Sequence, residues 1–113
     1  ISGFHAPLER DCLNILLRER QPIVVCLARG LERMRLPADW KKPLDHGRLL
    51  ILSGFPESVD RASRDTAAAR NRLVAALADD VVFAFVAAGG QLAELSRLVA
   101  SWDMKRRILT AAT

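Results

Sequence analysis

Residues 22–28, PIVVCLA, decide which class of fold this chain can adopt. The run is apolar throughout and rich in β-branched residues, which is typical of a strand that is covered on both faces. Strands of this kind occur in parallel sheets, where helices connect one strand to the next. The sequence on either side of this run is therefore expected to alternate helices with further strands.

That alternation continues along the chain. Helices are expected over residues 7–20, 39–46, 59–79 and 91–102, where apolar residues recur with helical spacing. Three further strands are expected over residues 48–53, 80–88 and 106–110. This order predicts an α/β fold: a Rossmann-like, doubly wound and largely parallel sheet with helices on both faces.

The first expected helix has clear start and stop signals. Pro7 suits the first helical position, and Glu9 and Asp11 come early, where the helix dipole favours negative charge. Pro22 ends the pattern. Its apolar face is expected to carry Leu8, Cys12, Ile15 and Leu16.

Length and composition predict one packed domain, residues 1–113. Ile1 resembles the last residue of a strand, so the first strand is expected to be truncated before Ile1. No apolar run approaches 18 residues and no signal peptide is present, which favours a cytoplasmic protein with no membrane partner. The two cysteines form no CxxC, and His5 and His46 have no metal-ligand spacing, so no metal and no cofactor are expected.

The glycines suggest where a ligand binds. Gly3, Gly30, Gly54 and the pair Gly89–Gly90 each follow the carboxyl end of an expected strand. In an open parallel sheet such loops share one edge, and ligands bind there. Glycine lets a phosphate approach the backbone, and a helix that begins directly after the loop adds free N–H groups. Tight turns also favour glycine, but several loops at one edge favour a phosphate site, as does the net charge of +4.

Arg70 extends the apolar stripe that Leu73, Val74 and Leu77 form on the helix over residues 59–79. A buried guanidinium needs an anionic partner, because an unpaired buried charge is costly. The spacing leaves two kinds of partner open. One is a ligand phosphate, and the other is an internal carboxylate: Asp79, Asp80 or Glu94.

Four segments resemble, in the same order, the Rossmann-like domain of the DNA-processing protein A (DprA/Smf) family. They are SGFHAPLERDCL, ARGLERMRLPADW, LLILSGFPE and ARNRLVAALADDVVFAFVAAGG. The family's Ser-Gly loop is matched by Ser2-Gly3, its next glycine loop by Arg29-Gly30, and its later serine by Ser53. The Arg-Asn-Arg element at residues 70–72 is the most specific match. The chain departs from the family in its first loop, SGFHAPLE, and in the loop at residues 88–91, AGGQ.

This resemblance implies binding of single-stranded DNA or a nucleotide through phosphate contacts, in DNA processing and recombination. It also implies a recombinase partner and a homodimer. No catalytic residue is expected. Together with the glycine loops, the resemblance gives a set of expected ligand residues: Ser2, Gly3, Phe4, His5, Arg29, Gly30, Ser53, Arg70, Asn71, Arg72, Gly89 and Gly90.

Two alternatives remain. The segment AAGGQLAEL is similar to the PGGxGTxxE loop of the lonely-guy phosphoribohydrolases, which split nucleoside monophosphates into base and ribose phosphate. Here the proline, the third glycine and the threonine are absent, and Glu94 is one residue too close to the glycine pair. A shift of one residue turns a helical side chain by about 100°, so binding is favoured over catalysis. The other alternative is a protein that keeps the fold without a ligand.

Overall fold

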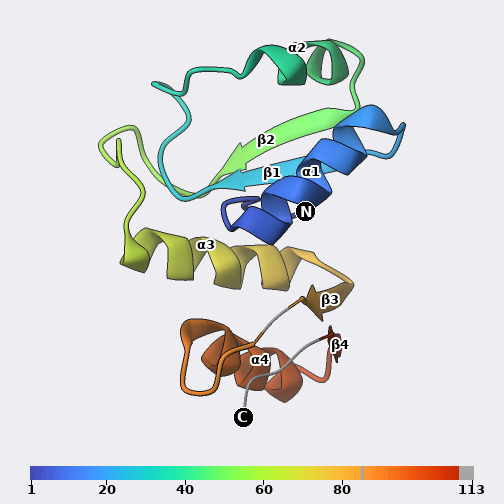
Figure 1. Cartoon of the computed structure of the whole chain (residues 1–113). Coiled ribbons are helices and arrows are strands. Elements are labelled where there is room, and N and C mark those ends of the chain that lie inside the picture. Colours follow the sequence, from blue (N-terminus) through green and yellow to red (C-terminus); the bar gives the residue numbers. More distant parts are fainter. Residues whose placement is uncertain (85, 110–113) are drawn as a thin grey trace. The chain divides into compact units, whose positions relative to one another are not determined.

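Helices and strands alternate along a computed structural model of the chain, which describes residues 1–84 and 86–109 (Figure 1). This confirms the expected α/β class. The residues expected in strands at 85 and 110 lie outside the described part. No described helix has the length and apolar character needed to cross a membrane. The elements are α1 (Pro7–Arg18), β1 (Ile23–Leu27), α2 (Ala38–Asp45), β2 (Leu49–Ser53), α3 (Arg64–Leu77), β3 (Asp80–Phe83), α4 (Gln91–Ser101) and β4 (Lys105–Ile108).

The chain divides into two compact units, Ile1–Arg70 and Asn71–Thr113. Each unit has a sheet of two parallel strands: β1 with β2 in the first, and β3 with β4 in the second. The boundary falls inside α3, directly after Arg70. Both described pairings are parallel, as expected, and they belong to two two-stranded sheets. One doubly wound sheet stays a prediction.

The first residues of the chain add a third strand position to the sheet of the first unit. Ser2 N donates to Val24 O at 3.2 Å, and Cys26 N donates to Ser2 O at 2.8 Å. Ser2 thereby forms a parallel bridge with Val25. Since Ile23 N bonds Arg48 O at 2.7 Å, β2 lies on the other side of β1. Ser2 therefore lies next to β1, on the side opposite β2, and a strand before it stays a prediction.

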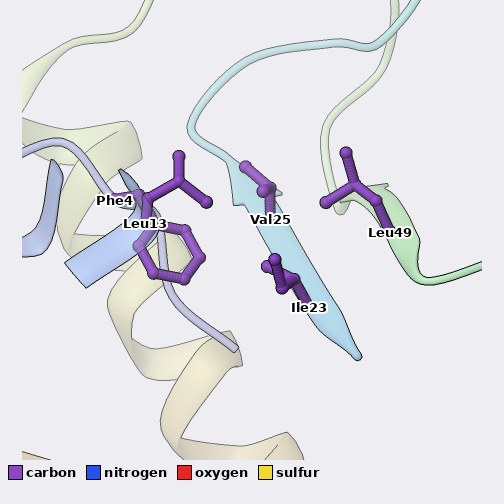
Figure 2. Close-up of a cluster of buried hydrophobic side chains, with 5 residues drawn as sticks. All are labelled: Phe4, Leu13, Ile23, Val25 and Leu49. Atoms are coloured by element: carbon purple, nitrogen blue, oxygen red, sulfur yellow. The ribbon is translucent and has the colours of Figure 1, made fainter. Parts of the chain in front are cut away.

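The core of the first unit joins α1 to one face of β1 and β2. Its buried members come from four segments and are drawn in Figure 2: Phe4, Leu13, Ile23, Val25 and Leu49. Trp40 and Leu44 of α2 pack against this cluster. Trp40 is therefore a packing residue.

The buried face of α1 differs from the expected one. Leu13 is buried, and Leu16 and Leu17 pack against the core. In contrast, Leu8 is 52% exposed and Ile15 is 53% exposed, and Cys12 is exposed as well. The helix carries two overlapping apolar stripes, and the contact with β1 and Phe4 selects the one that contains Leu13. The face predicted from spacing alone is therefore wrong, except for Leu16.

Local signals set the ends of α2 and α3. Gly47, with a φ of 72°, follows the C-cap of α2, where a left-handed residue commonly ends a helix. Helix α3 begins at Arg64, five residues later than expected. Its start is fixed by Ser63 and Thr66, because Thr66 N donates to Ser63 Oγ at 3.1 Å and Ser63 N donates to Thr66 Oγ1 at 2.7 Å. This reciprocal pair satisfies backbone donors at the helix start.

The second unit has its own small core, made of Ala75, Phe83, Val86 and Val99. Strand β3 pairs with β4 from Asp80↔Lys105 to Phe83↔Ile108. Leu77 was expected on the apolar stripe of α3 but is 55% exposed, because Ala75 is the residue of this turn that enters the core.

The choice of the α1 face can be tested by two substitutions. Leu13→Ala is expected to lower the free energy of unfolding by about 2–5 kcal/mol, the usual cost of emptying a buried leucine site. Ile15→Ala, on the exposed side, is expected to change it by no more than about 0.5 kcal/mol. Urea denaturation of both variants measures the difference. A larger loss for Ile15→Ala would show that the other stripe faces the core.

Candidate functional site

The carboxyl ends of three neighbouring strand positions meet at one edge of the sheet in the first unit. Ser2 lies beside Val25, and Ser53 lies beside Leu27 on the other side of β1. Because the three positions are parallel, the loops that follow them leave from the same edge. The structure thus brings together three of the expected glycine loops, at Gly3, Gly30 and Gly54.

The remaining glycine loop belongs to the second unit. Gly89 has a φ of 74°, and Gly90 precedes the first turn of α4. Asn71 and Arg72 also fall in this unit, where Asn71 is half-buried and Arg72 is exposed. Four of the expected ligand residues therefore lie in the second unit, and the other eight lie in the first unit.

The same three-residue turn occurs twice at the edge of the first unit. Phe4 N donates to Ser2 Oγ at 3.0 Å, and Phe55 N donates to Ser53 Oγ at 3.1 Å. In both turns the serine side chain bonds the backbone two residues on, as in an ST turn. The tripeptide Ser-Gly-Phe stands at both places in the sequence. This repetition is a signal from which the shared turn could have been predicted.

Both serine hydroxyls donate to groups of the protein itself. Ser2 Oγ donates to Glu9 Oε1 at 2.5 Å, and Ser53 Oγ donates to Arg29 O at 2.5 Å. A hydroxyl has a single proton to donate, so a phosphate can take it only by displacing Glu9 or the Arg29 carbonyl. The two serines shape their loops, and their role as phosphate donors stays a prediction. For Glu9 the sequence predicts only a favourable place in the first turn of a helix, whereas the structure brings it to the loop.

Backbone amides are the donors that the loops offer to a ligand. Within residues 1–84 and 86–109, the N–H groups of Gly3, His5 and Gly54 make no hydrogen bond. His5 and Gly54 are exposed, and Gly3 is half-buried. Amides of this kind at the ends of strands form binding sites for anions. The amide of Gly30 is different, because it donates to Val59 O at 2.7 Å.

Arg70 lies against the backbone of the first loop. The residue is only 7% exposed, and its Nη1 donates to Cys26 O at 3.5 Å. A Cβ atom on Gly3 would lie 2.0 Å from Arg70 Nη1 and 2.2 Å from Cζ, so any other residue would have to displace the guanidinium from this position. The burial of Arg70, predicted from its place on the stripe, is confirmed. Of the candidate carboxylates, Asp80 pairs with Arg107 at 3.1 Å.

Phe4 holds the first loop in shape. Its φ of 51° lies in the left-handed region, which is unfavourable for a bulky residue. Its ring is buried with Leu13 and Val25 in the core (Figure 2), and this burial offsets the backbone strain. The side chain of Phe4, an expected ligand residue, therefore packs inside the protein, and the ring fixes the backbone on which the amides of Gly3 and His5 lie.

The loops after β1 and β2 pack closely together. A Cβ atom on Gly30 would lie 2.5 Å from Pro56 O. Arg29 is half-buried there, and its Nε bonds Gly30 O at 3.4 Å. Arg29 thus supplies a second cation at this edge of the sheet.

A shallow, open hollow lies between the same two loops. Its lining residues are Arg33, Glu57, Ser58 and Asp60. Two carboxylates face one guanidinium, and this balance of charge disfavours a phosphate. The loop edge with Arg70 and Arg29 is therefore the better anion site.

A metal centre has no support in the part of the chain that the structure describes, where no three His, Cys, Asp or Glu side chains come together as metal ligands would. His5 is exposed in the first loop.

No family model, no curated protein and no solved structure significantly matches the chain. The resemblance to the DprA family therefore remains a prediction. The geometry of the loops and the two arginines, Arg70 and Arg29, are the features that favour a ligand site.

The contact between Gly3 and Arg70 can be tested by a double-mutant cycle. Gly3→Ala is expected to destabilise the protein, because the added Cβ must displace the guanidinium. When Arg70→Ala is present, the same change should cost less, with a coupling energy of about 0.5–3 kcal/mol. Urea denaturation of the four proteins measures this energy.

Arg64→Ala is the matched control for this cycle, since Arg64 lies on the same helix but is exposed. Its effect should add to that of Gly3→Ala within about 0.5 kcal/mol. Equal coupling of Gly3 to both arginines would contradict the contact.

Cys26, whose carbonyl accepts a hydrogen bond from Arg70, differs from Cys12 in the burial of its side chain. Its side chain is buried, whereas Cys12 is exposed. Burial raises the pKa of the Cys26 thiol above its ordinary value, and the positive charge of Arg70 partly opposes this rise. In the folded protein the Cys26 thiol therefore stays protonated at pH values where a free thiol ionises.

This difference predicts the behaviour of both thiols. A disulfide reagent should modify Cys12 rapidly in the folded protein and Cys26 only on unfolding, because the thiolate is the reactive form. As pH rises through the range in which a free thiol ionises, the unfolded chain releases the Cys26 proton while the native state keeps it. The free energy of unfolding should therefore fall as pH rises, and less so in Cys26→Ala. Equal reaction rates of the two thiols would contradict this assignment.

Proposed function

We propose that the chain is a Rossmann-like domain that binds a phosphate-bearing ligand, single-stranded DNA or a nucleotide, at the loop edge of its first unit. Parallel strands joined through helices are the parts from which a doubly wound sheet is built. In such sheets ligands bind beyond the carboxyl ends of the strands. The loops at Gly3, Gly30 and Gly54 lie at that edge.

The observation that carries the proposal is the position of the Arg70 guanidinium. It is buried against Gly3, next to the carbonyl of Cys26 at the end of β1. The amides of Gly3 and His5 come from the same loop and have no described partner. A guanidinium beside backbone N–H groups suits a phosphate, which arginine can hold with two hydrogen bonds.

The choice of ligand rests on the resemblance to the DprA family and on composition. The family binds single-stranded DNA through phosphates, and the Arg-Asn-Arg element at residues 70–72 is the most specific match. Aromatic residues make up 5% of the chain, which favours phosphate contacts over base stacking. A role in DNA processing or recombination, a cytoplasmic location, a recombinase partner and a homodimer belong to the same proposal.

Replacing Arg70 tests the site. Arg70→Gln is expected to weaken binding of a fluorescein-labelled oligodeoxynucleotide by about 10- to 100-fold, the usual loss when a charged hydrogen-bonding group is removed. Arg64→Gln removes the same charge from an exposed position on the same helix and should have a much smaller effect. Fluorescence anisotropy measures the affinities, and repeating the titration at several salt concentrations should show the steep dependence that phosphate contacts produce.

Two further measurements keep this test decisive. Because Arg70→Gln could reduce stability, its thermal midpoint is measured first, and Arg29→Gln provides a second variant at the same edge. Equal affinities of wild type and both variants would overturn the proposal. Release of free base from a nucleoside monophosphate, lost in Glu94→Gln, would instead support the phosphoribohydrolase alternative.

A further inference from the structure

Helix α1 leaves one of its two apolar stripes at the surface. Leu8 and Ile15 are each about half exposed, and Cys12 between them is exposed as well. At about 100° per residue, these three side chains fall within about 60° of one another around the helix. Leu13, on the other stripe, faces the core. The residues Leu8, Cys12 and Ile15, which we call the α1 stripe, thus have the spacing of a helix face that packs against a partner.

Two opposite charges border the α1 stripe on the edge that points away from the core. Asp11 and Arg18 are both exposed. They are seven residues apart, almost two helical turns, so they lie about 10 Å apart along the same edge. Within residues 1–84 and 86–109, the Asp11 carboxylate has no hydrogen bond or ion pair, and Arg18 uses only its Nε, which donates to Asn14 O at 3.2 Å. Both charges are therefore available to a partner.

This edge is complementary to itself. In a two-fold symmetric interface, residue i of one copy contacts residue j of the other, and j contacts i. When two helices pack antiparallel about such an axis, the same edge of each helix faces its counterpart, so Asp11 of one copy lies opposite Arg18 of the other. The apolar residues fit nearly the same axis, because Cys12 and Ile15 are centred one residue before the charged pair. One antiparallel register thus pairs both charges and packs each Cys12 against an Ile15.

We propose that the α1 stripe is the contact between two copies of this chain, whose α1 helices pack antiparallel about a two-fold axis. The inference rests on the part of the proposed function that makes the chain a homodimer, and it names the surface. The stripe is small, since a stable interface buries about 800 Å² per partner. The dimer is therefore expected in concentrated solution, with a Kd of about 10–100 μM, and it dissociates at the lower concentrations of an unfolding experiment.

Sedimentation velocity over a range of protein concentrations tests the contact. The wild type should change from monomer to dimer as its concentration rises. Ile15→Asp should weaken dimerisation at least about 100-fold, because both copies lose an apolar contact and bury a carboxylate. Leu50→Asp is the matched control, since Leu50 is as exposed as Ile15 but lies on β2. This control should leave the Kd unchanged.

Reversal of the two charges tests whether the partner is a second copy. Asp11→Arg places a cation opposite each Arg18 and should weaken dimerisation about 10-fold, because two ion pairs become two repulsions. Arg18→Asp should have the same effect. The double variant Asp11→Arg/Arg18→Asp restores both pairs with their signs exchanged, so its Kd should return to nearly that of the wild type. The thermal midpoint of each variant shows that it is folded.

Three results would overturn the inference: a wild type that stays monomeric up to about 1 mM, a dimer that survives Ile15→Asp, or a folded double variant that does not regain the dimer. Binding of a labelled oligodeoxynucleotide, measured in the same samples, separates this inference from the phosphate site. A wild type that dimerises through α1 but binds no oligonucleotide would support the inference and overturn the phosphate site alone.

Discussion

The guanidinium of Arg70 occupies the space beside Gly3 where any other residue would place its Cβ. This contact joins the first part of α3 to the loop that follows Ser2, and the hydrogen bond from Arg70 to Cys26 O joins it to the end of β1. A Cβ at this point would have to displace the end of the arginine side chain. The requirement for glycine at this position is therefore one of space, and it places a positive charge at the edge where the strands end.

The two Ser-Gly-Phe turns have the same backbone hydrogen bond, but their serine hydroxyls donate to different groups. Each serine accepts the amide of the phenylalanine two residues on, which fixes the loop after its strand. The two serine hydroxyls donate to different acceptors. Ser2 Oγ donates to the carboxylate of Glu9, and Ser53 Oγ donates to the main-chain carbonyl of Arg29. Charge at the edge of the sheet is thus decided by residues outside the repeated tripeptide.

Much of the fold could be predicted from local patterns. The α/β class, the order of the elements and the end of α2 near Gly47 follow from periodicity and from the placement of proline and glycine. The start of α3 was less predictable, because a helical pattern continues upstream of the Ser63–Thr66 pair that begins the helix. The buried face of α1 could not be read from spacing, since two apolar stripes fit the helix equally well.

The sequence by itself determined the alternation of helices and strands and the glycine at each loop, because these depend on residues that are near one another in the chain. The tertiary structure decided which face of α1 enters the core, that Phe4 packs inside while holding a strained loop, and that Glu9 reaches Ser2. These depend on contacts between segments whose distance in space is set only when the strands pair. The chemistry of the candidate site therefore lies in contacts that no local pattern specifies.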